Sequence, residues 1–102
     1  MDFLHDKTAA ILGYAFDQDL LPDFVKEASM PEQKEIEDLG FNAFAKPETM
    51  EYPCHNKVAT VLSALYASAN NETEDVLNRI TKFASAYEVD EVCNSIYKHF
   101  EV

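Results

Sequence analysis

The residues best suited to catalysis or metal binding are two cysteines and three histidines, and two of them are neighbours. Cys54 and His55 follow a proline in the stretch EYPCHNKVATVLSAL, residues 51–65. A thiol nucleophile needs a base within hydrogen-bond reach and a group that orients this base, and sequence neighbours seldom have that geometry. His99 could supply the base from elsewhere in the chain, but no recognisable nucleophile signature surrounds Cys54. The pattern therefore predicts no catalytic residue.

Metal binding is the second chemical alternative. Zinc prefers paired ligands at short fixed spacings, whereas Cys93 and His99 would lie on different faces of a helix. The acids of DQDLLPD, residues 17–23, resemble those of a calcium loop, but its glycine and its final glutamate are missing. Phosphate-binding and dinucleotide fingerprints are also missing from the sequence. We expect no metal and no cofactor, with a site made by Cys54, His55, Cys93 and an acid as the open alternative.

The Cys-His pair is better explained as the entrance to a helix. Asn56 is a good N-cap, and His55 precedes it where a helix must satisfy its free amide groups. Pro53 is expected to restrict Tyr52 to extended backbone. Cys54 then becomes a small apolar residue beside the first turn. The predicted structural residues of this entrance are Tyr52, Pro53, His55 and Asn56.

Helices are expected to position all of these residues. The chain has only two glycines, and no stretch alternates apolar and polar residues as a half-buried strand would. The pattern predicts an all-α fold, a small single domain of about five or six short helices. The expected helices cover about 3–16, 21–28, 30–39, 56–70, a fifth capped by Asn71 and a sixth capped by Asp90.

The single domain, 1–102, is predicted to have three parts. Residues 1–40 form an acidic helical N-terminal part, 41–55 an irregular connector, and 56–102 the helical core made by the last three helices. The expected anchors of the connector are Phe44, Met50 and Tyr52. The expected core residues on the helical stripes include Val61, Leu62, Leu65, Val76, Ile80, Phe83, Tyr87, Cys93 and Ile96.

Composition and charge exclude several classes of protein. The 102 residues suit one domain, and a hydrophobic content of 47% is too high for a disordered chain. Nineteen acids against eight bases give a net charge of −11, so most of the surface would repel nucleic acid or an anionic membrane. The apolar runs are much shorter than the roughly 20 residues of a membrane span, and no signal peptide is recognisable. We expect a reducing intracellular setting.

The negative charge is concentrated in the first half. Residues 1–51 contain twelve acids and four lysines, net −8, and residues 52–102 contain seven acids and four bases, net −3. The predicted helix at 30–39 is polar nearly all round and should be a solvated surface element. Its acids are the predicted partner-binding residues, namely Glu32, Glu35, Glu37 and Asp38. They would attract a protein partner with a basic surface.

Two segments resemble an uncharacterised helical module of tailed-phage gene products, over roughly residues 44–89. They are FAKPETMEYPCHNKVATVLSALYASANN, 44–71, and VLNRITKFASAYEV, 76–89. The module has a Phe-Ala start, a Tyr-Pro-x-His turn, a helix with an alanine-rich face and a second helix. The matching residues are Phe44, Ala45, Tyr52, Pro53, His55, Lys57, Ala59, Leu62, Ile80 and Ala84. The resemblance implies a phage origin and a role in the virion or in head assembly, without assigning any chemistry.

The charge and the resemblance lead to two alternative functions from different classes of protein. The first is a non-catalytic phage protein, virion-associated or an assembly factor, that acts through contacts with another virion protein, with self-association left open. It would be found in the virion or the host cytoplasm, neither secreted nor membrane-spanning. The alternative is a small acidic regulator or inhibitor of a host nucleic-acid enzyme. The acids cluster at helix starts rather than in a phosphate-like array, which favours the first function, and an enzyme comes third.

Overall fold

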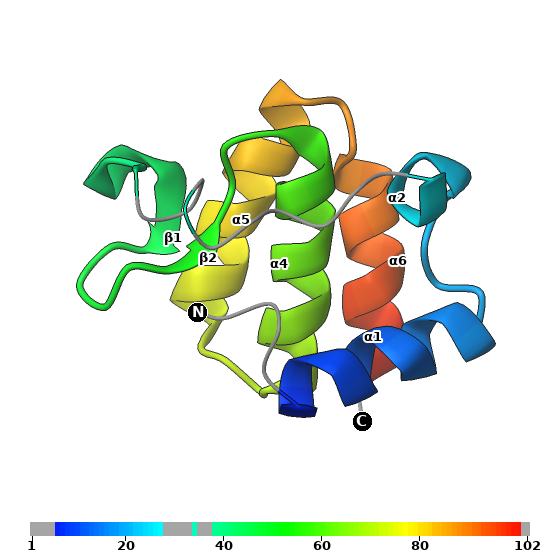
Figure 1. Cartoon of the computed structure of the whole chain (residues 1–102). Helices are drawn as coiled ribbons and strands as arrows, with labels where there is room; N and C mark the ends of the chain where they lie inside the picture. Colours follow the sequence, from blue (N-terminus) through cyan, green and yellow to red (C-terminus); the bar gives the residue numbers. More distant parts are fainter. Residues whose placement is uncertain (1–5, 28–33, 35–37, 101–102) are drawn as a thin grey trace.

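The fold is built around one central helix. The computed structural model describes residues 6–27, 34 and 38–100 of the chain. In this part of the chain, five α-helices and a short 3-10 helix pack with one two-stranded sheet. The helix at the centre is α4, Lys57–Ala69, which contacts helices at both ends of the sequence as well as the sheet (Figure 1). The predicted all-α class and small single domain are confirmed.

Helix α4 is central because its sequence, KVATVLSALYASA, is apolar nearly all round. A helix without a polar face must be covered on every side, and each residue from Ala59 to Ala67 is buried. Asn56 begins the helix as predicted, since its side-chain oxygen accepts a hydrogen bond of 2.8 Å from the Ala59 amide. Small alanine side chains allow the neighbouring elements to approach the helix closely.

Two amphipathic helices cover one side of α4. They are α5, Glu74–Ala86, and α6, Asp90–Phe100, and the two also contact each other. Thr73 caps α5, so the predicted cap at Asn71 is wrong. Asn71 has a φ of 57°, a left-handed conformation that suits the turn after α4 but not the extended backbone of an N-cap. Asp90 lies in the first turn of α6, where a negative charge is favourable.

The N-terminal helices pack against α4 from another side. Helix α1, Asp6–Asp17, runs across one end of α4 and α6, and the short α2, Asp23–Glu27, follows it (Figure 1). Ala15, Leu21 and Val25 are buried there. The N-terminal part therefore contributes to the core, which the sequence assigned to the last three helices alone. Most of the predicted helix at 30–39 lies outside the described residues.

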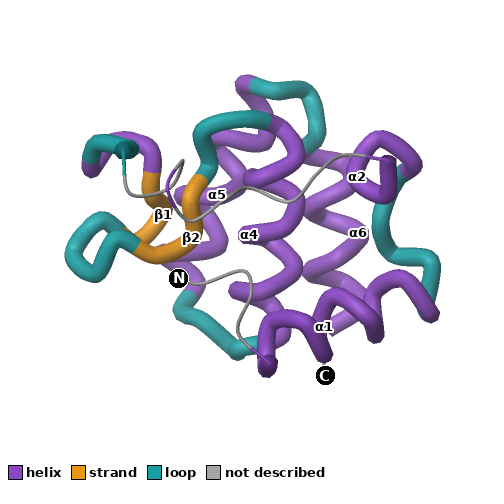
Figure 2. Tube along the Cα trace, viewed as in Figure 1, coloured by secondary structure: helices purple, strands orange, loops and turns teal. Residues whose placement is uncertain are grey.

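The predicted irregular connector at 41–55 is wrong in its main part, because this segment is regular. It contains the 3-10 helix η1, Phe41–Ala43, and strands β1, Phe44–Lys46, and β2, Glu51–Pro53. The strands pair antiparallel in the register Phe44 with Pro53 and Lys46 with Glu51, beside α4 and α5 (Figure 2). With three residues in each strand, the segment is too short to show a period of two.

Most of the expected anchors and core residues are buried. Phe44 and Tyr52 are 3% and 2% exposed, but Met50 is exposed at the hairpin turn. The predicted core residues Val61, Leu62, Leu65, Val76, Ile80, Cys93 and Ile96 are all buried. Two predicted core residues are not fully buried. Phe83 is only half-buried, and Tyr87 is exposed at the C-terminal end of α5.

Replacing Leu65 by alanine should lower the free energy of unfolding by about 2–5 kcal/mol, because Leu65 is fully buried on the central helix. Phe83→Ala should cost clearly less, because Phe83 is only half-buried. Urea titrations of the two variants measure the difference, with Lys98→Ala as an exposed control. Equal losses for Leu65→Ala and Phe83→Ala, or a loss for Leu65→Ala of only a few tenths, would contradict this description of the core.

Candidate functional site

The predicted helix entrance is the junction between β2 and α4. Pro53 is fully buried at the end of β2, and its carbonyl accepts a hydrogen bond of 2.7 Å from the Ser63 hydroxyl. The Asn56 carbonyl accepts a hydrogen bond of 2.7 Å from the Thr60 hydroxyl. His55 is half-buried between the strand and the helix. The structure thus places Tyr52, Pro53, His55 and Asn56 together at this junction.

Tyr52 does not have the predicted extended backbone. Its φ is 61°, which is in the left-handed region, and a bulky residue there carries strain of about 1–3 kcal/mol. The local preference before a proline is overridden because the side chain is buried and hydrogen-bonded. Its hydroxyl donates to Glu72 Oε1 at 3.2 Å and accepts from Asn70 Nδ2 at 3.4 Å. Burial raises the pKa of Tyr52 to about 12, so the hydroxyl keeps its proton.

Glu72 connects the hairpin to the turn between α4 and α5. The same oxygen that accepts from Tyr52 lies 3.4 Å from Lys46 Nζ. Lys46 belongs to β1 and Tyr52 to β2, so one carboxylate holds both strands. Its side chain is only 18% exposed, which keeps solvent screening low. We call Lys46, Tyr52, Asn70 and Glu72 the clamp.

The two cysteines are enclosed in the core. Cys54 and Cys93 are 0% exposed, and burial raises the pKa of each thiol from 9.0 to about 12. The thiolate is the reactive form of cysteine, and it is nearly absent at neutral pH with such a pKa. His99 shares a hydrogen bond of 2.8 Å with the Tyr14 hydroxyl on α1. Among residues 6–27, 34 and 38–100, no three or more His, Cys, Asp or Glu side chains gather as a metal site.

The predicted acidic site lies mostly outside the part of the chain that the structure describes. Glu32, Glu35 and Glu37 are outside it, and Asp38 is exposed. The assignment of these four residues to partner binding stays a prediction.

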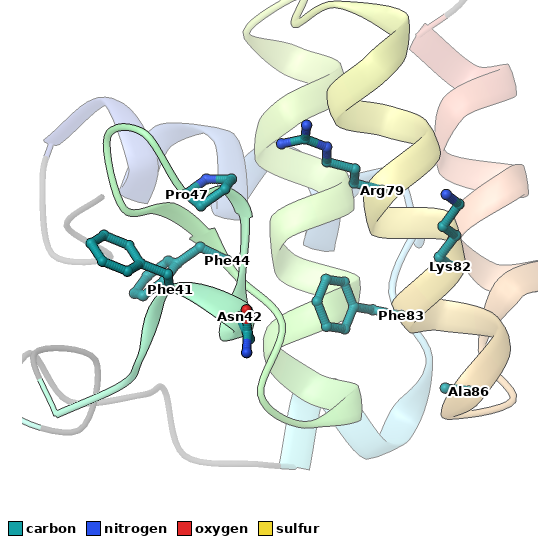
Figure 3. A pocket seen from close by; sticks show the side chains of 8 residues that line it. All are labelled: Phe41, Asn42, Phe44, Pro47, Arg79, Lys82, Phe83 and Ala86. Atoms are coloured by element: carbon teal, nitrogen blue, oxygen red, sulfur yellow. The ribbon is translucent and has the colours of Figure 1, made fainter.

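A groove that the sequence did not predict lies between the hairpin and α5. It has a volume of about 550 Å³. Its lining residues come from η1, the hairpin and α5, and are Phe41, Asn42, Phe44, Pro47, Arg79, Lys82, Phe83 and Ala86 (Figure 3). The α5 residues are spaced i, i+3, i+4 and i+7, so they share one face of the helix. In the sequence, only the spacing of these four residues could have indicated the groove, and it indicates only the wall that α5 forms.

Contacts between the hairpin and α5 fix the two walls of the groove. Strand β1 contacts α5, and Arg79 Nη1 donates a hydrogen bond of 3.3 Å to the Ala45 carbonyl. Phe44 is buried beneath the groove, whereas Phe41 at its mouth is 66% exposed. The Phe83 ring extends from α5 toward the hairpin, whereas the Phe41 ring extends away from α5 (Figure 3). The groove is therefore apolar at its base and open to solvent.

The charge of the groove is opposite to that of the whole chain. Among the residues that the structure describes, the charged ones in the lining are Arg79 and Lys82 and none is acidic, although the chain carries a net charge of −11. Arg79 lies 3.6 Å from Glu48, and both side chains are about half exposed or more, at 49% and 64%. Such an exposed ion pair is weak. Within the described ranges, no carboxylate forms an ion pair with Lys82.

Comparison with protein-family models, curated proteins and solved structures found no significant match to the chain. The resemblance to the phage module over residues 44–89 therefore stays a prediction. No helix in the described part of the chain is long and apolar enough to span a membrane. The fold defines a small helical domain with an apolar groove that carries two basic side chains.

The free energy of unfolding should fall as the pH rises above 9. Between the ordinary thiol pKa of 9.0 and the folded value of about 12, the unfolded chain loses protons that the folded chain keeps. The contribution of the two thiols is complete below pH 9, and each then loses about 1.4 kcal/mol per pH unit.

Urea titrations between pH 8 and pH 10 test this expectation with a cysteine-free variant as the reference, because the unfolded tyrosines, with an ordinary pKa of 10.0, also begin to ionise over that range. The variant Cys54→Ala/Cys93→Ala should be less stable but should lose stability more slowly as the pH rises. Equal slopes for the variant and the wild type would show that the thiols are not the cause.

Proposed function

We propose that this protein is a non-catalytic module that acts by binding another protein in the groove between the hairpin and α5. The observation that carries the proposal is the groove of about 550 Å³ with Phe41, 66% exposed, at its mouth. Small soluble domains seldom leave large aromatic side chains around an apolar hollow unless a partner covers them. Aromatic residues and arginine are also the types enriched at protein interfaces.

The chemistry of the lining residues supports binding over catalysis. None of the described lining residues is a histidine, cysteine, aspartate or glutamate, so they provide apolar contact and positive charge rather than a nucleophile or a carboxylate. The thiols of Cys54 and Cys93 are buried in the core, away from solvent. Burial also raises the pKa of Tyr66 and Tyr97, which keeps these hydroxyls protonated.

The wider setting that we propose is a phage virion or an assembly intermediate in the host cytoplasm, as the sequence resemblance implies. The segment 44–89 folds as the hairpin, α4 and α5. Six of the eight lining residues fall in this segment, and the other two, Phe41 and Asn42, precede it directly. The part of the chain that resembles the phage module is thus the part that builds the groove, which supports a role in binding for that module.

Site-specific photo-crosslinking tests the proposal. With p-benzoylphenylalanine at position 41 of the full chain, irradiation in cells that produce the protein should give a covalent adduct with another protein. Phe16 on α1, 42% exposed, provides the matched control position. Ala86→Gln, at an exposed position that lines the groove, should fill the groove and remove the adduct.

The proposal fails if position 41 gives no adduct. It also fails if positions 41 and 16 give the same adducts, because the contact would then be nonspecific. Retention of the adduct in the Ala86→Gln variant would exclude the groove as the binding surface.

A further inference from the structure

We propose that the groove binds a short segment of a partner protein that places one or two large apolar side chains in it and carries acidic residues beside them. This inference rests on the proposed function and adds the chemistry of the partner. The charge of the sequence predicts a basic partner for the acidic N-terminal part, so the groove defines a second and different surface.

The size of the groove favours a short segment over a folded domain. The wall formed by α5 extends from Arg79 to Ala86, which is two helical turns or about 10 Å. A volume of about 550 Å³ accommodates one or two large side chains but not the face of a folded domain. Amphipathic segments bind such grooves by inserting apolar residues from one or two turns.

The positive charges of Arg79 and Lys82 at the edge of the groove favour acidic residues in that segment. Arg79 and Lys82 lie on the same face of α5 as Phe83, so carboxylates next to an inserted apolar side chain would be within their reach. A basic segment would be repelled at this rim. Elsewhere the net charge of −11 repels an acidic segment, so the groove is where apolar contact and charge attraction coincide.

Glu48 forms an ion pair with one of the two basic residues of the groove, so its substitution tests the preference for acidic segments. Its carboxylate lies 3.6 Å from Arg79 Nη1 at the edge of the groove, and the pair is exposed. A carboxylate of the partner would compete with Glu48 for Arg79. Removing the charge of Glu48 should therefore strengthen binding, whereas reversing the charge of Lys82 should weaken it.

Three other occupants are disfavoured by the same observations. A second copy of the chain or a nucleic acid would each bring strong negative charge over an area wider than the groove, where the chain, with its net charge of −11, repels it. A small apolar molecule is best bound where most of its surface is enclosed, and this groove is open at Phe41, Arg79 and Lys82.

The test is selection from a random, ribosome-displayed library of twelve-residue peptides on the immobilised full-length protein. The selected peptides should be enriched in leucine, methionine or aromatic residues together with aspartate or glutamate, and depleted in lysine and arginine.

Lys82→Glu should weaken the binding of a selected peptide about tenfold, and Phe41→Ala should do the same. Glu48→Gln should tighten binding. The controls are Lys98→Glu and Phe16→Ala, exposed positions outside the groove, which should change the affinity less than twofold.

Opposite shifts for Lys82→Glu and Glu48→Gln support the inference, and neither residue is in the core. Selection of basic or uncharged peptides overturns it, as does an affinity that Lys82→Glu and Lys98→Glu change equally. Tighter binding of a single-stranded oligonucleotide, or self-association removed by Phe41→Ala, assigns the groove to another occupant and also overturns it. If a specific adduct forms at position 41 while no acidic peptide binds, the protein-binding function stands and only the partner chemistry is wrong.

Discussion

The groove depends on the hydrogen bonds that hold a very short hairpin against the turn between α4 and α5. A two-stranded hairpin is marginally stable in water by itself, and each strand here has three residues. The Tyr52 hydroxyl donates to Glu72 at 3.2 Å, and Lys46 Nζ lies 3.4 Å from the same oxygen. A hydrogen bond to a charged group contributes about 1.5–3 kcal/mol, which is enough to decide whether so small a hairpin is ordered. With the hairpin fixed, β1 and η1 become one wall of the groove.

Helix α5 serves the core and the groove with different residues. Val76, Ile80 and Ala84 are buried in the core, whereas Arg79, Lys82, Phe83 and Ala86 line the groove. Because α4 requires cover on every side, α5 is held in place by the core whether or not a partner is bound. Under the proposed function, substitution of these groove residues should therefore affect recognition more than folding. Exposed aromatic and basic side chains at this surface are consistent with that division.

The structural features that the sequence predicted correctly are those with a local sequence pattern. The amphipathic period of 3.6 is clear in α5 and α6, and the Asn56 cap has a local signature that the structure confirms. The hairpin has strands too short for a visible period of two, and Tyr52 departs from its local preference because it bonds to residues 18 and 20 positions away. The groove brings Phe41 and Phe83 together from distant parts of the chain, so the sequence offered only its α5 half, through the spacing of Arg79, Lys82, Phe83 and Ala86.

Amide hydrogen exchange of the Tyr52→Phe variant tests most directly whether the clamp holds the hairpin and so creates the groove. The Cys54 amide, which donates to the Ala43 carbonyl at 2.7 Å, reports on the closed hairpin. Losing a stabilisation of about 1.5–3 kcal/mol should make this amide exchange roughly ten- to a hundredfold faster. The central amides of α4 should keep their wild-type rates, and an exposed Tyr87→Phe control should change neither. Unchanged exchange at Cys54, or equal acceleration at Cys54 and in α4, would contradict the account.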